Sequence, residues 1–364
     1  MGRASTILAV ALAMAQSTRL RRSHPSGSNA PSSVFVRSSL KTCQGLRAES
    51  YATSKTISKI WYFEEITKIN SMNDLVTPPE RQAKMELYDG RMLAWSEWGP
   101  VDGLPVLFCT GAGMSGWLGF GASDLPGLGL KLIAIDRPGL GLSDAHPNKT
   151  LSSWVDDTRE FIQVNDLHDV LAVGFSQGAP FAFALAGRNL VKAIAIVSGQ
   201  DELAYPRVRP LLHPDVEGMI AAVQQDAVKF EQHFSQMATQ QGLWQLIIGM
   251  SAQRDRALYE SDTLGEAYQR ALKEGFSQGA QGYARDLVNA LGSWPVKLED
   301  ITVPVDLWYG GLDTSTVHSP DFGATLASRL PNASHTIDPE EGGSILWTRS
   351  WDILAKLKSH LSIT

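Results

Sequence analysis

The sequence predicts an α/β fold with a mostly parallel, doubly wound sheet that helices cover on both faces. From residue 84 onward, short apolar runs that fit buried strands alternate with segments of helical spacing. Continuous apolar strands of this kind are typical of a parallel sheet covered on both faces. The chain has 364 residues, of which 43% are hydrophobic and 19% are charged. That is enough apolar material for the core of one large domain or two modest ones.

The alternating region begins with a hairpin, in which residues 84–88 and 91–98 flank the turn Asp89-Gly90. Apolar runs predict further strands over residues 105–109, 130–135, 170–174, 191–197, 303–309 and 334–338. Helical spacing is found over residues 151–164, in an Ala-rich run that ends at 186, and over about 321–330 and 348–361. In a fold of this kind the active groups lie on loops at the carboxyl ends of the strands.

Residues 201–298 interrupt this alternation. They contain several amphipathic helical segments, which predict a cap inserted between the sixth strand (191–197) and the seventh (303–309). We therefore expect a core built from residues 84–200 and 299–364, with 201–298 as the helical cap. Residues 51–83 give no strong fold signal and are expected to form a linker of uncertain structure.

The amino-terminal 50 residues differ in composition from the rest. Residues 1–48 contain seven basic side chains and no acidic one, and they are rich in serine. An Arg-rich, Ser-rich and acid-free segment is typical of a transit peptide, so we expect delivery to a plastid or mitochondrion. The apolar run over residues 7–15 also resembles a secretory signal, and an untargeted tail of a cytoplasmic protein is the third interpretation.

Composition also excludes several classes of function. The net charge of −6 argues against a general nucleic-acid binder, and no apolar run approaches the ~20 residues of a membrane span. Two cysteines, Cys43 and Cys109, cannot build a disulfide framework or a Cys-based metal site. Neither a phosphate-binding P-loop nor an H-E-x-x-H helix is present. We expect no cofactor and no metal, and a small-molecule substrate or ligand as the partner; the oligomeric state is not predicted.

The most specific motif reads Gly174-Phe175-Ser176-Gln177-Gly178 and lies between a predicted strand and a predicted helix. This G-x-S-x-G context is that of a nucleophile elbow, in which a sharp turn exposes the serine at a helix amino terminus. The turn requires small residues two positions before and two positions after the serine. The partial positive charge at that end of the helix favours a developing oxyanion, so Ser176 is the predicted nucleophile.

A second motif, Thr110-Gly111-Ala112-Gly113, follows the strand at 105–109. Glycines let a backbone turn its N–H groups toward one point, as an oxyanion hole requires. In a serine hydrolase with an elbow, the residue after the nucleophile supplies one N–H and an earlier loop supplies the other. The predicted donors are the N–H groups of Gln177 and of Ala112, or of Gly113 in place of Ala112.

Together these motifs resemble the α/β-hydrolase superfamily, in its capped AB hydrolase-1 type, over roughly residues 84–361. The resemblance rests on Trp98-Gly99, the loop 110–114, the elbow, Asp313, and residues 136–144, which read Asp-Arg-Pro-Gly-Leu-Gly-Leu-Ser-Asp. It implies the α/β-hydrolase fold with a helical cap between strands six and seven. It also implies a catalytic acid after the seventh strand, where Asp313 follows Gly310-Gly311-Leu312; Asp201, after the sixth strand, is the competing acid.

The chain departs from the family at the general base. Relatives usually read Pro-Gly-x-Gly-His after the last strand, whereas this chain places Gly343 at the expected histidine position. A serine needs an adjacent base to become a strong nucleophile. We predict His318, because it lies five residues after Asp313 on the loop that leaves the seventh strand. The alternatives are His146, His213 and His233, or a water oriented by Glu340 or Glu341.

The predicted function is therefore a serine hydrolase, most simply an esterase that acts on a small or medium-sized apolar substrate. Ser176 would attack, His318 would act as the base and Asp313 would orient it. The alternative is a catalytically weak or inactive member of the same fold that binds a small molecule in the same pocket. The glycine at position 343 favours the alternative, and the serine elbow with its acid favours the hydrolase.

Overall fold

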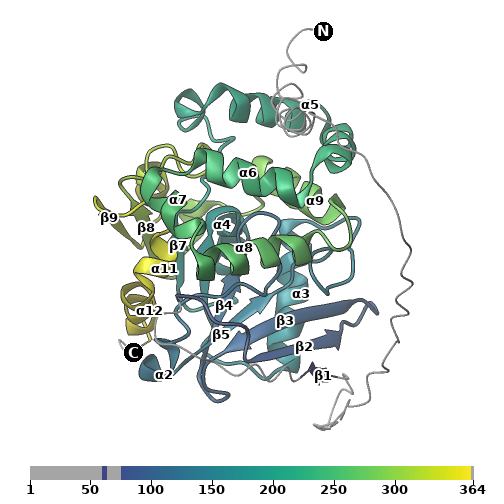
Figure 1. The fold of residues 1–364 in the computed structure, drawn as a ribbon, viewed down its shortest axis with the longest axis vertical. Helices are drawn as coiled ribbons and strands as arrows, with labels where there is room; N and C mark the ends of the chain where they lie inside the picture. Colours follow the sequence, from purple (N-terminus) through teal and green to yellow (C-terminus); the bar gives the residue numbers. More distant parts are fainter. Residues whose placement is uncertain (1–59, 64–74, 362–364) are drawn as a thin grey trace, which may run out of the picture.

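The computed structural model describes residues 60–63 and 75–361 (Figure 1). The predicted targeting segment lies outside these residues. One nine-stranded sheet forms the centre of the described chain, in the order β1-β2-β3-β5-β4-β6-β7-β8-β9. The strands are β1 (Ile60–Phe63), β2 (Arg81–Glu86), β3 (Met92–Trp98), β4 (Leu104–Cys109), β5 (Leu130–Ile135), β6 (Leu171–Phe175), β7 (Ile194–Val197), β8 (Val305–Gly310) and β9 (Ala333–Asp338).

The six strands from β5 to β9 along the sheet are parallel, while β1, β2 and β3 join the edge in antiparallel pairs. The hairpin between β2 and β3 turns at Gly90, whose φ of +86° belongs to the left-handed region that glycine adopts easily. All residues of β6 and β7 are buried. Their continuous apolar sequences thus confirm the predicted mostly parallel α/β sheet.

Helices cover both faces of the sheet, and alternate side chains of each strand point to opposite faces. In β4, Leu107 and Cys109 pack with α3 (Leu151–Val164), α4 (Ala179–Ala186) and α10 (Ala324–Arg329). The neighbouring Val106 and Phe108 pack on the other face. That face is covered by α2 (Leu125–Leu128), α11 (Ile345–Thr348) and α12 (Ser350–Ser359).

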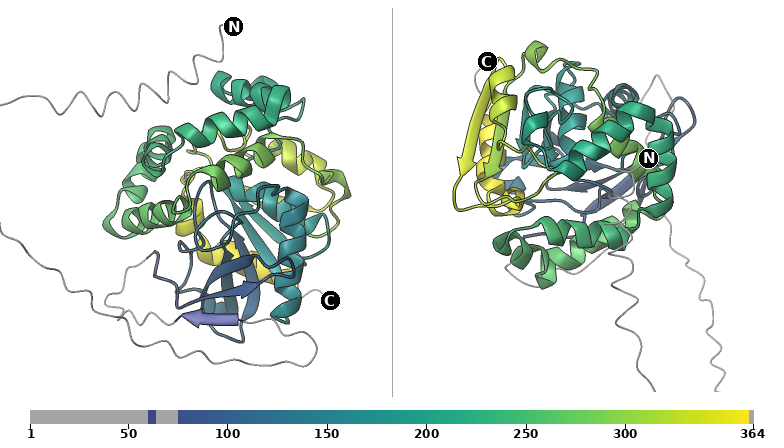
Figure 2. Two further views of the ribbon diagram at one scale, coloured as in Figure 1. Left: turned by 90° about the vertical axis from the view of Figure 1, so that its right-hand side faces the viewer. Right: turned by 90° about the horizontal axis from the view of Figure 1, so that it is seen from above.

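Five helices between β7 and β8 form the cap. These two strands are the ones predicted as the sixth and the seventh, so the cap lies where it was expected. They are α5 (Pro214–Met237), α6 (Gln240–Met250), α7 (Gln253–Tyr259), α8 (Asp262–Gly275) and α9 (Gln281–Leu291). Figures 1 and 2 show these green helices together over the end of the sheet at which β6 and β8 finish. None of the helices within residues 75–361 has the length and apolar character that crossing a bilayer requires.

The structure adds one strand that the sequence pattern did not indicate. Residues 60–63 form β1, which pairs antiparallel with β2 inside the segment that we expected to be a linker. An apolar run of four residues without flanking turn signals is too short to identify as a strand from its pattern. The helix expected over about 348–361 is α12, and the short helix α11, which the sequence pattern did not indicate, precedes it.

Candidate active site

Ser176 lies at the sharp turn between β6 and α4. Its φ is +52°, a left-handed conformation that is uncommon for a residue with a side chain. The glycines around it are needed for space. A Cβ on Gly178 would lie 1.9 Å from the carbonyl oxygen of Cys109, and one on Gly174 would lie 2.9 Å from Cβ of Ala182. Small residues on both sides therefore let the turn pack against β4 and α4 and leave the Ser176 hydroxyl at the end of the sheet.

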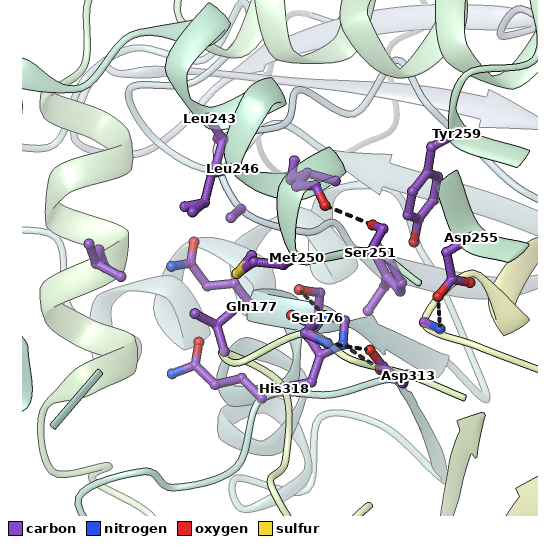
Figure 3. A pocket seen from close by; sticks show the side chains of 18 of the residues that line it. Ser176, Gln177, Leu243, Leu246, Met250, Ser251, Asp255, Tyr259, Asp313 and His318 are labelled. Carbon is purple, nitrogen blue, oxygen red and sulfur yellow. Dashed lines mark hydrogen bonds and ion pairs between the residues drawn. The ribbon is translucent and has the colours of Figure 1, made fainter. Parts of the chain in front are cut away.

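His318 connects Ser176 to Asp313 (Figure 3). Its Nε2 lies 3.0 Å from Ser176 Oγ, and its Nδ1 lies 2.6 Å from Asp313 Oδ2. Because the carboxylate accepts the Nδ1–H, Nε2 is left with a lone pair that can take the serine proton. His318 and Asp313 both belong to the loop between β8 and α10, so a single segment carries the imidazole and its acid. The arrangement is capable of activating a hydroxyl nucleophile.

Gly343 lies against this group of side chains and lines the same cavity. A Cβ on Gly343 would lie 3.0 Å from Asp313 Oδ1, a closer approach than packed atoms normally tolerate. The cap holds the other side of the loop after β9, to which Gly343 belongs. Asp255 of α7 accepts hydrogen bonds from the N–H groups of Gly343 and Ser344 (2.9 Å each) and from the Ser344 hydroxyl (2.6 Å).

The alternative candidates lie elsewhere. In the part of the chain that the structure describes, His318 is the only histidine bonded to Ser176. His146 accepts from the N–H of Asn148, His213 caps α5, and His233 is exposed. Glu341 is paired with Arg254 at 2.9 Å, and the exposed Glu340 follows β9. Asp201, the competing acid, has its carboxylate at Ser319 instead of at the imidazole.

The predicted oxyanion loop lies beside the elbow. Within residues 75–361, no acceptor is found for the N–H groups of Ala112 or Gln177. Both residues line the same cavity as Ser176. Arg137 fixes the loop by donating to the carbonyl oxygens of Thr110 (2.7 Å) and Gly111 (2.9 Å). Fixing these carbonyls leaves the following N–H groups free to bind a ligand oxygen.

Arg137 also connects this loop to the cap. It is fully buried, and its Nε donates to Asp286 of α9 at 2.8 Å. Lys149 pairs with the other carboxylate oxygen of Asp286 at 2.6 Å. A buried cation needs a partner of opposite charge, so this cluster fastens α9 to the core next to the oxyanion loop.

An apolar cavity opens above Ser176, as Figure 3 shows for the side facing α6. Its volume is about 80 Å³. Its cap wall is mainly apolar. The helices α6 and α9 contribute the aliphatic side chains of Leu243, Leu246, Ile247, Met250, Leu287 and Leu291, and three tyrosines of the cap, Tyr259, Tyr268 and Tyr283, add aromatic rings. Helical periodicity identified these helices, but it could not show which of their faces would cover the serine.

Burial shifts the pKa of two carboxyl groups near the site. It raises the pKa of Asp201 to about 7 and that of Asp136 to about 6. In Asp136 the N–H groups of Gly116 and Leu142 oppose this shift by donating to the carboxylate. The described residues contain no group of three or more His, Cys, Asp or Glu side chains arranged to hold a metal ion.

Comparison with known proteins agrees with this architecture. A family model described as alpha/beta hydrolase fold matches residues 105–349, whereas no curated protein matches the chain. Two similar solved structures are an esterase from Exiguobacterium antarcticum (17% identity, TM-score 0.53, 77% of this chain and 98% of that one) and an enol-lactonase from Burkholderia xenovorans (15%, 0.54, 75% and 98%). A bromoperoxidase from Bacillus anthracis is similar at 18% identity and a TM-score of 0.52, over 75% of this chain and 96% of that one. At these identities the likeness shows the fold alone.

Proposed function

Because this chain belongs to the α/β-hydrolase fold family, we propose that it is a serine hydrolase that cleaves esters of small or medium-sized apolar substrates. One observation carries the proposal. The Ser176 hydroxyl, the His318 imidazole and the Asp313 carboxylate form a continuous hydrogen-bonded series of 3.0 Å and 2.6 Å beneath an apolar cavity. A base within hydrogen-bond reach of a hydroxyl, itself oriented by a carboxylate, is the arrangement that nucleophilic catalysis requires.

In the proposed reaction, Ser176 Oγ attacks the ester carbonyl carbon while His318 Nε2 takes the hydroxyl proton. Asp313 stabilises the imidazolium that forms. The N–H groups of Ala112 and Gln177 donate to the oxyanion of the tetrahedral intermediate. The intermediate collapses to an acyl-enzyme as His318 returns the proton to the leaving alcohol. Water activated by the same imidazole then releases the acid and restores the serine.

The aliphatic wall of α6 and α9 supports an apolar substrate. Burying a methylene group in such a wall contributes roughly 0.8 kcal/mol, so each additional carbon should strengthen binding until the cavity is full. Two of the similar structures are described as an esterase and an enol-lactonase, and both names refer to cleavage of an ester-type bond. Those likenesses support the bond type in the proposal and carry no information on the substrate.

A second candidate function is binding without turnover. The observation that favours it is Gly343, which leaves the usual base position without a side chain. In that case the cavity would hold an apolar ligand and Ser176 would remain unreactive.

The two functions are separated by an assay of p-nitrophenyl esters with acyl chains of two to ten carbons. We expect the wild-type chain to hydrolyse them, with KM falling as the acyl chain lengthens. Ser176→Ala should reduce kcat by about 10⁴-fold or more and leave the protein folded. Wild-type protein that binds a medium-chain fatty acid but hydrolyses no ester faster than Ser176→Ala would favour the second function.

A further inference from the structure

We propose that Asp201 is a positioning residue for the base: its neutral carboxyl group, acting through Ser319, holds the loop that places His318 against Ser176. This inference rests on the proposed function, because it concerns the same imidazole. It addresses a question that the position of His318 raises. The histidine lies on a long loop after β8, so some contact must hold it at a fixed distance from the nucleophile.

The contact is made by the residue directly after the base. Ser319 donates its N–H to the carbonyl oxygen of Gly199 (3.0 Å), and its Oγ lies 3.1 Å from Asp201 Oδ2. Gly199 and Asp201 both follow β7, next to the strand that precedes the His318 loop. Two hydrogen bonds therefore join the end of β7 to the neighbour of His318. Ser319 is 5% exposed and Asp201 is 0% exposed, so water cannot replace these bonds.

The hydroxyl group of Ser319 has a single hydrogen, which limits how many carboxylates can accept from it. Its oxygen faces Asp201 Oδ2, Asp321 Oδ1 at 2.9 Å and the N–H of Gly323 at 2.9 Å. The Tyr309 hydroxyl also lies beside it, but its hydrogen is donated to the carbonyl oxygen of Gly199. A hydroxyl group has one hydrogen and two lone pairs. The Gly323 N–H uses one lone pair, and the hydroxyl hydrogen can reach only one carboxylate. The remaining contact is a hydrogen bond only when the other carboxyl group carries a proton and donates it.

The carboxyl group of Asp321 has more hydrogen-bond donors around it than that of Asp201. Its Oδ2 accepts hydrogen bonds from the N–H (3.0 Å) and the hydroxyl (2.6 Å) of Thr325, and its Oδ1 faces Ser319. Hydrogen bonds donated to a carboxylate favour its charged form. Besides Ser319, Asp201 accepts from the N–H of Glu202 (2.7 Å). The proton therefore belongs on Asp201, which donates to the second lone pair of Ser319.

The charges around Asp201 agree with this assignment. Burial raises its pKa to about 7 against the opposing hydrogen bonds from Ser319 and from the N–H of Glu202, and the negative charge of Asp321 acts in the same direction as burial. Arg329 of α10 opposes the shift, but it is paired with Glu202 and Glu299 at 2.7 Å each. Tyr309 of β8 contributes a neutral hydroxyl, which donates to Gly199. Ionisation of Asp201 would place a second negative charge beside Asp321 and remove one hydrogen bond from Ser319, so the His318 loop should loosen as pH rises above about 7.

Hydrogen–deuterium exchange tests the proposal without reference to catalysis. Peptides covering residues 314–323 are followed at pH 6.5 and 8.5 in wild type, Asp201→Asn and the exposed control Asp102→Asn, with correction for the intrinsic rate. Asparagine keeps an N–H donor toward Ser319 at both pH values. We expect corrected exchange in wild type and in the control to rise at least fivefold between the two pH values, and Asp201→Asn to stay protected. Unchanged wild-type protection, or an equal rise in Asp201→Asn, would overturn the proposal.

Ester hydrolysis provides the second readout. The ratio of wild-type kcat to Asp201→Asn kcat, in which the pH dependence of the shared His318 base cancels, should fall as the pH rises from 6.5 to 9. Asp201→Leu, which has no donor, should lower kcat at every pH with a smaller change in KM. A catalytic fall of the same size in Asp201→Asn would contradict the positioning role. If Ser176→Ala hydrolyses esters as fast as wild type, the proposed function fails, and the exchange experiment still decides whether Asp201 holds the loop.

Discussion

The loops that follow β8 and β9 differ sharply in what they contribute to the site. The loop after β8 carries both Asp313 and His318 in a stretch of six residues; His318 contacts Ser176, and Asp313 contacts His318. The loop after β9 carries Gly342 and Gly343 and contributes backbone alone. Yet the two loops touch: a Cβ on Gly310, at the end of β8, would lie 2.3 Å from the carbonyl oxygen of Gly342.

The difference between the two loops indicates that more than one loop at this edge of the sheet can place an imidazole beside the serine. Neighbouring parallel strands end side by side, so loops from either strand can reach the same point. The glycines after β9 have a separate physical role. A Cβ on Gly342 would lie 2.3 Å from Asp255 Oδ2, and one on Gly343 would meet Asp313. The chain passes between two carboxylates, where a side chain at position 342 would clash and one at position 343 would have to displace the Asp313 carboxylate slightly.

The largest effect on activity is expected from His318. Replacing it with alanine removes the group that takes the Ser176 proton, and we expect kcat to fall by about 10⁴-fold with little change in KM. The exposed His168, which is paired with Asp166 on the surface, provides the matched control. Steady-state ester hydrolysis should be unchanged in His168→Ala. Equal activity in both variants would show that the loop after β8 does not supply the base.

Asp313→Asn sharpens the assignment of the acid. The amide cannot stabilise an imidazolium and permits the wrong tautomer, so kcat should fall by roughly 10³- to 10⁴-fold. Asp201→Asn, assayed at pH 6.5, should retain most of the wild-type rate. The opposite ranking of the two variants would transfer the acid role to the residue after β7.

Asp255→Ala probes the backbone loop after β9. The substitution leaves three buried donors of Gly343 and Ser344 without an acceptor, and each such loss costs about 1–3 kcal/mol. We therefore expect the free energy of unfolding, measured in urea, to fall by about 3 kcal/mol or more. The exposed Glu260→Ala at the end of the same helix should change it by less than about 0.5 kcal/mol. A loss no larger than that of the control would mean that Asp255 does not fasten the cap to this loop.

Placing a histidine at position 343 tests whether the loop after β9 can supply the base in place of the loop after β8. We expect His318→Ala/Gly343→His to remain within about tenfold of His318→Ala in kcat. The new Cβ would press on the Asp313 carboxylate, which leaves the ring no room to align with both partners. Recovery of activity toward the wild-type rate would show that a histidine at position 343 can act as the base and that packing does not require a glycine there.

Local patterns account for the features that sequence alone could predict. The elbow around Ser176 is encoded in five consecutive residues, and the interruption of the strand–helix alternation indicates the cap. His318 and Asp313 are five positions apart, so chain order alone places them on one loop. The short strand β1 escaped prediction because a run of four apolar residues has no measurable period.

Contacts between distant residues could not be predicted. Arg137 and Asp286 are 149 positions apart, and Asp255 and Gly343 are 88 apart, so each pair meets only after the cap has packed on the core. No spacing rule relates such positions. The burial of Asp201 next to Ser319, 118 positions later, has the same origin.

The central claim is that Ser176 is activated by His318. The most direct measurement is the rate at which a fluorophosphonate probe modifies the protein, with the modified residue identified by peptide mass spectrometry. We expect one adduct on Ser176 in wild type, no adduct there in Ser176→Ala, and modification at least about 10³-fold slower in His318→Ala. Modification of Ser176 at the wild-type rate in folded His318→Ala would contradict the central claim.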